Sequence, residues 1–139
     1  MSGLAGEIEA RDAWKILEQD DGAVLIDVRT DAEWTYVGVP DLSPLGKTPV
    51  RLSWQLFPEM AVDPGFCDKL ESLGLPRDAP LLFICRSGAR SRAAAEAMAA
   101  RGYTRCYNVV DGFEGDPDAH NHRGTINGWK VASLPWVQE

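Results

Sequence analysis

The sequence predicts a single α/β domain, and two patterns support this prediction. Short apolar segments of strand length alternate along the chain with segments whose apolar residues follow a helical period. The most apolar of the short segments, residues 81–85, has no polar interruption, which is typical of a strand buried on both faces of a parallel sheet. With 139 residues, 45% of them hydrophobic and 25% charged, the chain is long enough to bury one core.

The first part of the chain predicts a helix, a buried strand and a second, shorter helix. Residues 10–19 repeat apolar side chains at helical spacing, and the apolar segment 23–27 follows as a buried strand. Thr30 precedes Glu33 by three positions, the spacing of a capping box, which predicts a short helix beginning at Thr30.

The remaining elements continue the alternation and end in an aromatic segment. They are predicted as a loop at 37–49, a strand near 50–53, a helix at 64–73, a strand at 80–84, a helix at about 90–101 and a strand at 105–110. The polar, glycine-rich stretch 111–128 is longer than the connections of most compact domains. The tail 129–136 is aromatic again, and we expect it to dock on the core.

The charge balance limits the possible partners and locations of the protein. Fourteen Lys and Arg residues against 21 Asp and Glu give a net charge of −7, so the chain lacks the basic character of a sequence-independent nucleic-acid binder. An uncharged run of about 18 residues, which a membrane span needs, is missing from the sequence. Glu7 and Glu9 interrupt the N-terminal stretch before the apolar region of a signal peptide can form. We expect a cytoplasmic protein that binds neither nucleic acid nor membrane.

The three cysteines differ in their sequence surroundings. Their odd number and the absence of a CxxC pair predict neither a disulfide framework nor a zinc site. Cys106 lies within a predicted strand and is interpreted as a core residue, and Cys67 on a predicted helix is interpreted as a packing or surface residue. Cys85 follows the most apolar strand, at the edge where open α/β sheets bind ligands.

The segment from Cys85 to Ser91 has the composition of an anion-binding loop that carries a nucleophile. Successive backbone N–H groups before a helix form a concave anion site, and Gly88 allows the close backbone approach that such a loop requires. Arg86 and Arg90 make the segment locally positive, which favours the nucleophilic thiolate of Cys85. The alternative is a buried cysteine that only fills space at a strand end. The flanking arginines and glycine favour the nucleophile.

The sequence resembles the single-domain rhodanese-like sulfurtransferases over most of its length, from about residue 7 to residue 136. The matching parts are the segment 25–29 (LIDVR) followed by Glu-Trp at 33–34, the loop 85–91 (CRSGARS), the strand end 108–113 (NVVDGF), Gly-Trp-Lys at 128–130 and Leu-Pro at 134–135. The resemblance implies a central parallel sheet of about five strands with helices on both faces and a six-residue catalytic loop that begins at Cys85. One rhodanese domain is then expected over residues 7–136, between short tails at 1–6 and 137–139.

The resemblance also implies a two-step sulfur transfer that needs no cofactor. The Cys85 thiolate would take the outer sulfur of a small anionic donor such as thiosulfate and pass it, from a persulfide, to a thiol, a protein acceptor or cyanide. Backbone amides of the loop (Arg86, Ser87, Gly88, Ala89 and Arg90) are expected to hold the persulfide, and the side chains of Arg86 and Arg90 to attract the anion.

Four side chains are expected to support the loop, each with a second interpretation. Asp27 and Arg29 follow the neighbouring strand and either brace the loop or form a plain strand-end ion pair. The hydroxyls of Ser87 and Ser91 either donate to the sulfur or cap the following helix, and capping is the preferred interpretation for Ser91.

Two other functions remain as alternatives. Dual-specificity phosphatases share the fold but separate their cysteine and arginine by five residues, whereas Cys85 and Arg90 are separated by four. Phosphatase activity or arsenate reduction is therefore disfavoured. A persulfide carrier or regulatory module that docks on a protein partner remains open, with the apolar segment 54–60 as a docking patch or, alternatively, as ordinary core.

Two features depart from the common family pattern. The loop after Trp34 reads Val-Gly-Val-Pro at 37–40, where the family often has a histidine. A loop insertion at about 114–128 carries His120 and His122, which we interpret as solvated residues and not as a metal site. We expect this insertion to cover part of the active-site mouth, because long ordered loops often act as lids.

Overall fold

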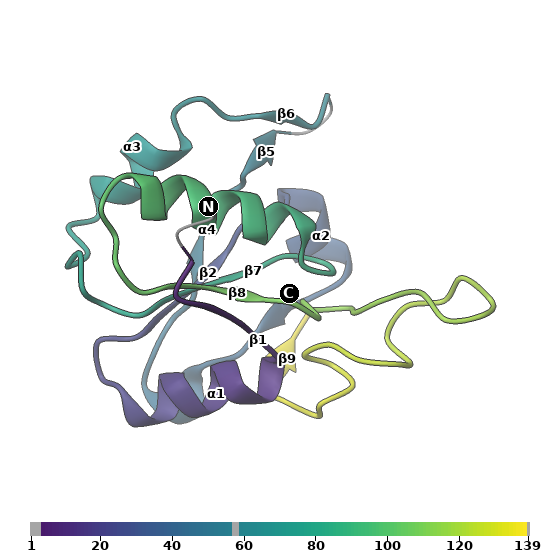
Figure 1. The fold of residues 1–139 in the computed structure, drawn as a ribbon. Helices are drawn as coiled ribbons and strands as arrows, with labels where there is room; N and C mark the ends of the chain where they lie inside the picture. The colour runs from purple at the N-terminus through teal and green to yellow at the C-terminus, as the bar shows by residue number, and fades with distance from the viewer. Residues whose placement is uncertain (1–3, 57–58, 139) are drawn as a thin grey trace.

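A computed structural model of the chain describes residues 4–56 and 59–138 (Figure 1). Its centre is a five-stranded sheet in the order β1-β8-β7-β2-β4, and every pairing in it is parallel. The strands of this sheet are β1 (Gly6–Ile8), β2 (Val24–Asp27), β4 (Val50–Arg51), β7 (Leu81–Ile84) and β8 (Cys106–Val109). The predicted α/β architecture with a parallel sheet of about five strands is confirmed.

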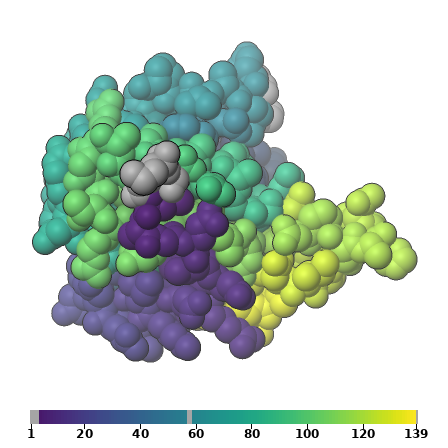
Figure 2. Space-filling model, viewed as in Figure 1, coloured from purple at the N-terminus to yellow at the C-terminus, as the bar shows by residue number. Residues whose placement is uncertain are grey.

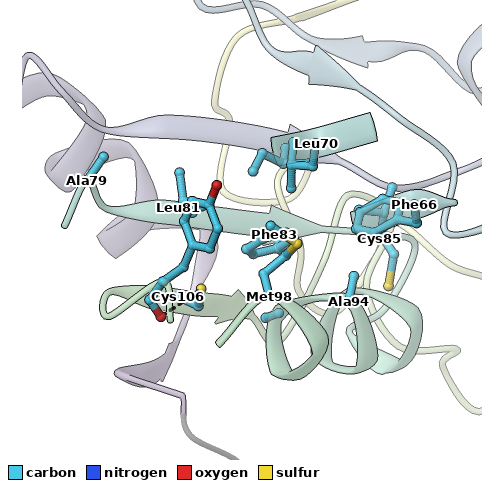
Figure 3. Close-up of a cluster of buried hydrophobic side chains, with 13 residues drawn as sticks. Phe66, Leu70, Ala79, Leu81, Phe83, Cys85, Ala94, Met98 and Cys106 are labelled. Carbon is cyan, nitrogen blue, oxygen red and sulfur yellow. Dashed lines mark hydrogen bonds between the residues drawn. The ribbon is translucent and has the colours of Figure 1, made fainter. Parts of the chain in front are cut away.

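Helices cover both faces of this sheet, as predicted (Figure 1). The helix α1 (Ala10–Gln19) packs on one face, and α3 (Phe66–Glu71) and α4 (Ala89–Ala100) pack on the other. Strand β7 contributes side chains to the apolar clusters on both faces of the sheet, because alternate side chains of a strand point to opposite faces. Leu81 and Phe83 belong to the apolar cluster under α3 and α4 that Figure 3 draws, and Leu82 and Ile84 belong to the cluster under α1.

The local signals in the sequence locate most elements to within two residues. Helix α1 has the predicted bounds, and α2 (Asp31–Tyr36) begins after a complete capping box of Thr30 and Glu33. Helix α3 is shorter than the predicted range 64–73. The longest helix of the described ranges is α4 with 12 residues, and no helix there is long and apolar enough to span a bilayer.

Strand β1 lies across the expected boundary between the N-terminal tail and the domain. Gly6 pairs with Tyr107, the amide of Ala5 donates to the carbonyl of Cys106, and Leu4 packs against the core. The partner of β1 is about 100 positions away in the sequence, so the three residues carry no local pattern that could have predicted a strand.

Two short antiparallel ribbons and a 3-10 turn complete the structure. One ribbon joins β3 (Val39–Pro40) to β9 (Trp136–Val137), and the other joins β5 (Gln55–Leu56) to β6 (Ala61–Val62). The 3-10 turn spans Ser43–Leu45. The predicted docking of the C-terminal segment is confirmed, because Trp129 is fully buried and its indole N–H donates to the carbonyl of Pro135 at 2.7 Å. Strand β9 continues one residue past the expected domain end at 136.

The insertion leaves the body of the molecule as an arm, which Figures 1 and 2 show in lime and yellow. Its outer part is organised around Asp118, whose carboxylate accepts from the backbone of His120 and His122 and from the hydroxyl of Thr125. These hydrogen bonds lower the pKa of Asp118. The arm is therefore held mainly by its own hydrogen bonds.

Candidate active site

The loop 85–88 connects β7 to α4, and Gly88 determines its shape. Gly88 is the N-cap of α4 with a φ of 104°, in the left-handed region that favours glycine. A Cβ at this position would collide with the carbonyl oxygen of Val110. The structure therefore confirms the close backbone approach expected from Gly88.

The sulfur of Cys85 is buried but faces hydrogen-bond donors. Only 1% of the residue is exposed, and Figure 3 shows it at one end of an apolar cluster. Its Sγ accepts from the backbone N–H of Gly88 at 3.1 Å and lies 3.2 Å from the hydroxyl oxygen of Ser91. The sulfur thus has polar partners that a space-filling core cysteine would lack.

A cavity of about 610 Å³ opens over this sulfur. Its wall includes two residues of the predicted loop besides the two arginines and Cys85, and it also reaches α2 and the β5–β6 ribbon. The lining residues are Glu33, Val37, Gln55, Met60, Cys85, Arg86, Ser87, Ala89, Arg90 and Glu114. Cys85 is therefore reachable from solvent through this cavity.

Arg90 does not point freely into the cavity, because it is bound to Glu33. The guanidinium donates two hydrogen bonds to the carboxylate, at 2.6 and 2.9 Å, and both side chains are mostly buried. Burial raises the pKa of Glu33, but the hydrogen bonds and charge of Arg90 outweigh it and hold this pKa below its usual range. The hydrogen bonds that Arg90 donates to Glu33 raise the pKa of Arg90. The pair joins α2 to the start of α4.

Arg86 and Glu114 provide the unpaired charges of the cavity. Arg86 is exposed, and its guanidinium has no ion pair or hydrogen bond within residues 4–56 and 59–138. Glu114 lies on the same wall, and its backbone N–H donates to the carbonyl of Arg86 at 3.1 Å. Of the two arginines expected to attract an anion, Arg86 is the one that is free to do so.

The backbone of the loop is held from below by residues 112–115. The N–H of Phe113 donates to the carbonyl of Cys85 at 2.8 Å, and the N–H of Gly115 donates to the carbonyl of Arg86 at 3.1 Å. Gly112 has a φ of 64°, and a Cβ there would collide with the carbonyl of Arg86. The Asp-Gly-Phe sequence after β8 therefore forms the floor of the loop.

Asp27 and Arg29 form a fully buried ion pair beside this floor. The guanidinium of Arg29 binds both carboxylate oxygens of Asp27, at 2.6 Å for the shortest contact, and donates to the carbonyl of Gly38. It also lies over the ring of Phe113 at 4.3 Å. Both interpretations of the pair therefore apply: it is a strand-end ion pair, and it supports the loop through Phe113.

The preferred interpretation of Ser91 as a helix cap is wrong. Gly88 occupies the N-cap, so Ser91 lies within the first turn of α4 and its hydroxyl points back to the sulfur and to β8. There it donates to Oδ1 of Asn108 at 2.6 Å. The sequence predicts for Asn108 a strand position in the matched segment 108–113, where its signal is a lone amide within an apolar segment, and no role beside the sulfur. It predicts Glu33 in the capping box and in the matched Glu-Trp pair, and no contact with Arg90.

The other candidate groups lie away from this site. Burial raises the pKa of Cys106 to about 12, in keeping with its predicted core role. Burial also raises the pKa of Cys67 on α3. His120 and His122 lie on the arm with ring centroids 6.4 Å apart, and the described ranges contain no cluster of three metal-ligating side chains. Of the insertion, Glu114 lines the cavity, and the outer arm projects away from the body (Figure 2).

Trp54 and its neighbours divide between core and surface. Trp54 packs edge-on against Phe66 at 5.1 Å, as ordinary core, whereas Leu56 and Met60 are partly exposed. Met60 lines the cavity. The rest of the expected docking patch, residues 57–58, lies outside the described residues.

Comparison with known proteins places this geometry in a family. Residues 5–139 match the family described as the STR4 middle domain. The Arabidopsis thaliana protein named rhodanese-like domain-containing protein 4, chloroplastic, is 31% identical over 96% of this chain and 26% of its own length. The chain belongs to the rhodanese-like family.

Other relatives match most of the chain. An uncharacterized protein of Rickettsia conorii is 40% identical over 89% of this chain and 90% of its own length, and a protein of Allochromatium vinosum named sulfurtransferase is 26% identical over 96% of both. The crystal structure of Rv0390 from M. tuberculosis is 46% identical, with a TM-score of 0.90 over 98% of this chain and 99% of that one. The fold is therefore that of a single rhodanese-like unit.

Proposed function

We propose that the protein is a sulfurtransferase that stores a sulfane sulfur on Cys85. In the first step the thiolate attacks the outer sulfur of a donor such as thiosulfate. The donor's S–S bond breaks, sulfite leaves with the bonding electrons, and a persulfide remains on Cys85. In the second step an acceptor thiolate or cyanide attacks the terminal sulfur, and the Cys85 thiolate is released.

One observation carries this proposal: the sulfur of Cys85 accepts from the backbone N–H of Gly88 at the base of an open cavity. Hydrogen bonds to a charged sulfur stabilise it, and the N-terminus of α4 adds a favourable dipole. A persulfide on this sulfur would extend into the cavity beside Arg86, whose free charge attracts an anionic donor and departing sulfite.

The Arg90–Glu33 pair argues against the phosphatase alternative. An arginine that clamps a phosphate directs two parallel N–H groups to phosphate oxygens. In this protein the Nη1 and Nη2 groups of Arg90 are directed instead to the carboxylate of Glu33, at 2.6 and 2.9 Å. The four-residue separation of Cys85 and Arg90 points the same way. Sulfur chemistry needs only the sulfur, the amide of Gly88 and an open path.

The size of the cavity favours an acceptor larger than cyanide and keeps a persulfide carrier as the second candidate. Cavities of about 300–1,000 Å³ accommodate drug-sized molecules, and the volume here is about 610 Å³. Its charges balance, because the free Arg86 is offset by Glu114 and Arg90 is paired with Glu33. The partly exposed Leu56 and Met60 lie on its β5–β6 side. An organic thiol or a cysteine of a protein partner fits these features.

Intact mass spectrometry after incubation with thiosulfate tests the proposal. We expect one added sulfur atom, lost in Cys85→Ser and retained in the matched control Cys106→Ser, whose thiol lies in the core. Added cyanide or an organic thiol should remove this sulfur again. If the adduct persisted in Cys85→Ser, the nucleophile would be another cysteine.

Activity assays separate the candidate functions. Turnover of thiosulfate with cyanide, without hydrolysis of an aryl phosphate, is expected of a sulfurtransferase. A persulfide that forms but turns over only with a protein acceptor would identify a carrier. Phosphate release without thiocyanate would overturn both proposals.

A further inference from the structure

Asn108 binds both groups that face the sulfur of Cys85. It lies in β8 next to β7, in register with Phe83, and is 3% exposed. Its side-chain N–H donates to the carbonyl of Gly88 at 3.1 Å, and its Oδ1 accepts from the hydroxyl of Ser91 at 2.6 Å. The N–H of Gly88 and the hydroxyl of Ser91 are the two polar groups within hydrogen-bond distance of Sγ. One side chain thus touches both without touching the sulfur itself.

The carbonyl of Gly88 fixes the orientation of the Asn108 amide. A carbonyl oxygen only accepts hydrogen bonds, so the NH₂ group must face it and the Oδ1 must face Ser91. Oδ1 also only accepts. The single proton of the Ser91 hydroxyl therefore points to Asn108, and an oxygen lone pair is left to face Cys85.

This proton position suits a neutral Sγ. A thiol can donate its S–H to the lone pair of Ser91, 3.2 Å away. A thiolate needs a donor instead, so Ser91 must turn its proton away from Asn108 and leave Oδ1 without that partner. A persulfide again places a neutral Sγ beside Ser91, because the charge lies on the outer sulfur.

We infer that Asn108 is a positioning residue that holds the Ser91 proton and so favours the thiol and the persulfide of Cys85 over the free thiolate. The inference rests on the proposed function, since it concerns the same sulfur. In the reaction, attack on the donor moves the negative charge from Sγ to the outer sulfur, and the Ser91 proton returns to Asn108. The network thereby stabilises the stored sulfur relative to the starting nucleophile.

The pH dependence of Cys85 alkylation tests this role without any sulfur transfer. Iodoacetamide reacts with the thiolate, so the midpoint of its rate against pH reports the thiolate fraction. Asn108→Leu removes the acceptor, frees the Ser91 proton for the thiolate, and should increase the thiolate fraction below the midpoint by about 3- to 10-fold. Asn108→Asp keeps an acceptor and adds negative charge, and should decrease it.

Opposite shifts distinguish positioning of the proton from a merely structural role. A loosened loop would misalign the Gly88 amide in both variants and lower the thiolate fraction in both. The increase in thiolate fraction caused by Asn108→Leu should vanish when Ser91→Ala is added, because the proton that Asn108 holds is then gone. Asn127→Leu is the matched control: its amide binds Asp116 on the arm and should leave the midpoint unchanged.

The other charges near the sulfur stay constant in these variants. They are Arg86 and Arg90 from the loop and α4, Glu33 from α2, Glu114 after β8, and Asp27 at the end of β2. Modified peptides are mapped by mass spectrometry so that only Cys85 is counted. If Asn108→Leu does not fold, Asn108→Ala replaces it. Alanine also removes the amide oxygen and the NH₂ group, so the thiolate fraction of Cys85 should again increase.

Three results would overturn the inference. The alkylation midpoint of Cys85 could shift with the same sign in Asn108→Leu and Asn108→Asp, it could stay unchanged in both, or the increase caused by Asn108→Leu could persist when Ser91→Ala is added. Mass spectrometry with thiosulfate reports separately on the proposed function. A persulfide that forms in wild type without opposite midpoint shifts would leave the sulfurtransferase standing and refute the role of Asn108. Opposite midpoint shifts without any persulfide would support the role of Asn108 and refute the sulfurtransferase proposal.

Discussion

Cys85 and Cys106 lie at opposite ends of the same apolar cluster and are equally buried, yet their surroundings differ (Figure 3). Cys85 follows β7, and Cys106 begins the parallel strand β8, in register with Leu81. The sulfur of Cys85 has the Gly88 amide and the Ser91 hydroxyl beside it, whereas the S–H of Cys106 donates to the carbonyl of Tyr103. Burial alone therefore does not distinguish the proposed nucleophile from a core residue. The two cysteines are distinguished by the strand end at which each one lies.

Alkylation of the native protein should show the largest contrast. At pH 7 a pKa of about 12 leaves Cys106 as thiolate in roughly one molecule in 100,000. We expect iodoacetamide to modify Cys85 at least about 100-fold faster than Cys106, measured on separate peptides by mass spectrometry. Unfolding in denaturant should bring the two rates together. Comparable alkylation rates of Cys85 and Cys106 in the folded protein would show that the two strand ends do not differ in thiol reactivity.

Substitution of Gly88 should disturb the tight loop that lies beside Cys85 and has no counterpart beside Cys106. Gly88→Ala introduces a Cβ against the carbonyl of Val110, at a φ of 104°. We expect it to lower the free energy of unfolding by about 2–4 kcal/mol, from backbone strain plus the collision, and to slow alkylation of Cys85.

Gly46 provides the matched control for Gly88. Gly46→Ala also places alanine at a positive φ, 69°, but its Cβ meets nothing within 4 Å. We expect a loss of about 1 kcal/mol in urea denaturation, from backbone strain alone. Equal losses in the two alanine variants would show that the Val110 contact does not restrict the loop.

The Glu33–Arg90 pair should contribute the smallest effect and a recognisable pH dependence. Because the pKa of Glu33 is lowered in the folded protein, its stabilisation is present above the unfolded pKa and is lost as the pH falls through the folded one. We expect Glu33→Gln to cost about 1 kcal/mol at pH 7 and progressively less as the pH falls below the unfolded pKa. Urea denaturation at pH 7 and in acid measures this.

Glu18→Gln on the exposed side of α1 is the control for Glu33 and should show no such change with pH. A deficit of Glu33→Gln that stayed constant down to pH 3 would contradict the ionic origin of the effect. The pair would then act by shape alone.

Local signals predicted most of the fold and the centre of the site. The capping box at Thr30, the apolar run before Cys85 and the glycine at 88 each depend on neighbouring residues, and each has the predicted structural role. The whole cavity could not be predicted, because Glu33 reaches Arg90 from 57 positions away. Spacing along the chain gives no sign of such a contact.

The preference for Ser91 as a helix cap, over its alternative beside the sulfur, is wrong for the same reason. A serine near a helix start is typically a cap when only its neighbours are considered. Here Asn108, 17 positions later, provides a stronger partner and draws the hydroxyl toward the sulfur. Strand β1 likewise depends on β8. What the sequence left open is the set of contacts between distant segments.

The pairing of β1 also affects how the chain folds. Strand β1 is an edge strand whose neighbour is β8, and the first N–H of α1, at Ala10, donates to the carboxylate of Asp111. Both contacts join segments about 100 residues apart. During synthesis the first strand and helix must wait until residues 106–111 have left the ribosome. Closure of the N-terminal segment is therefore a late and slow step of folding, and the Cys85 loop, whose floor is residues 112–115, is also completed late.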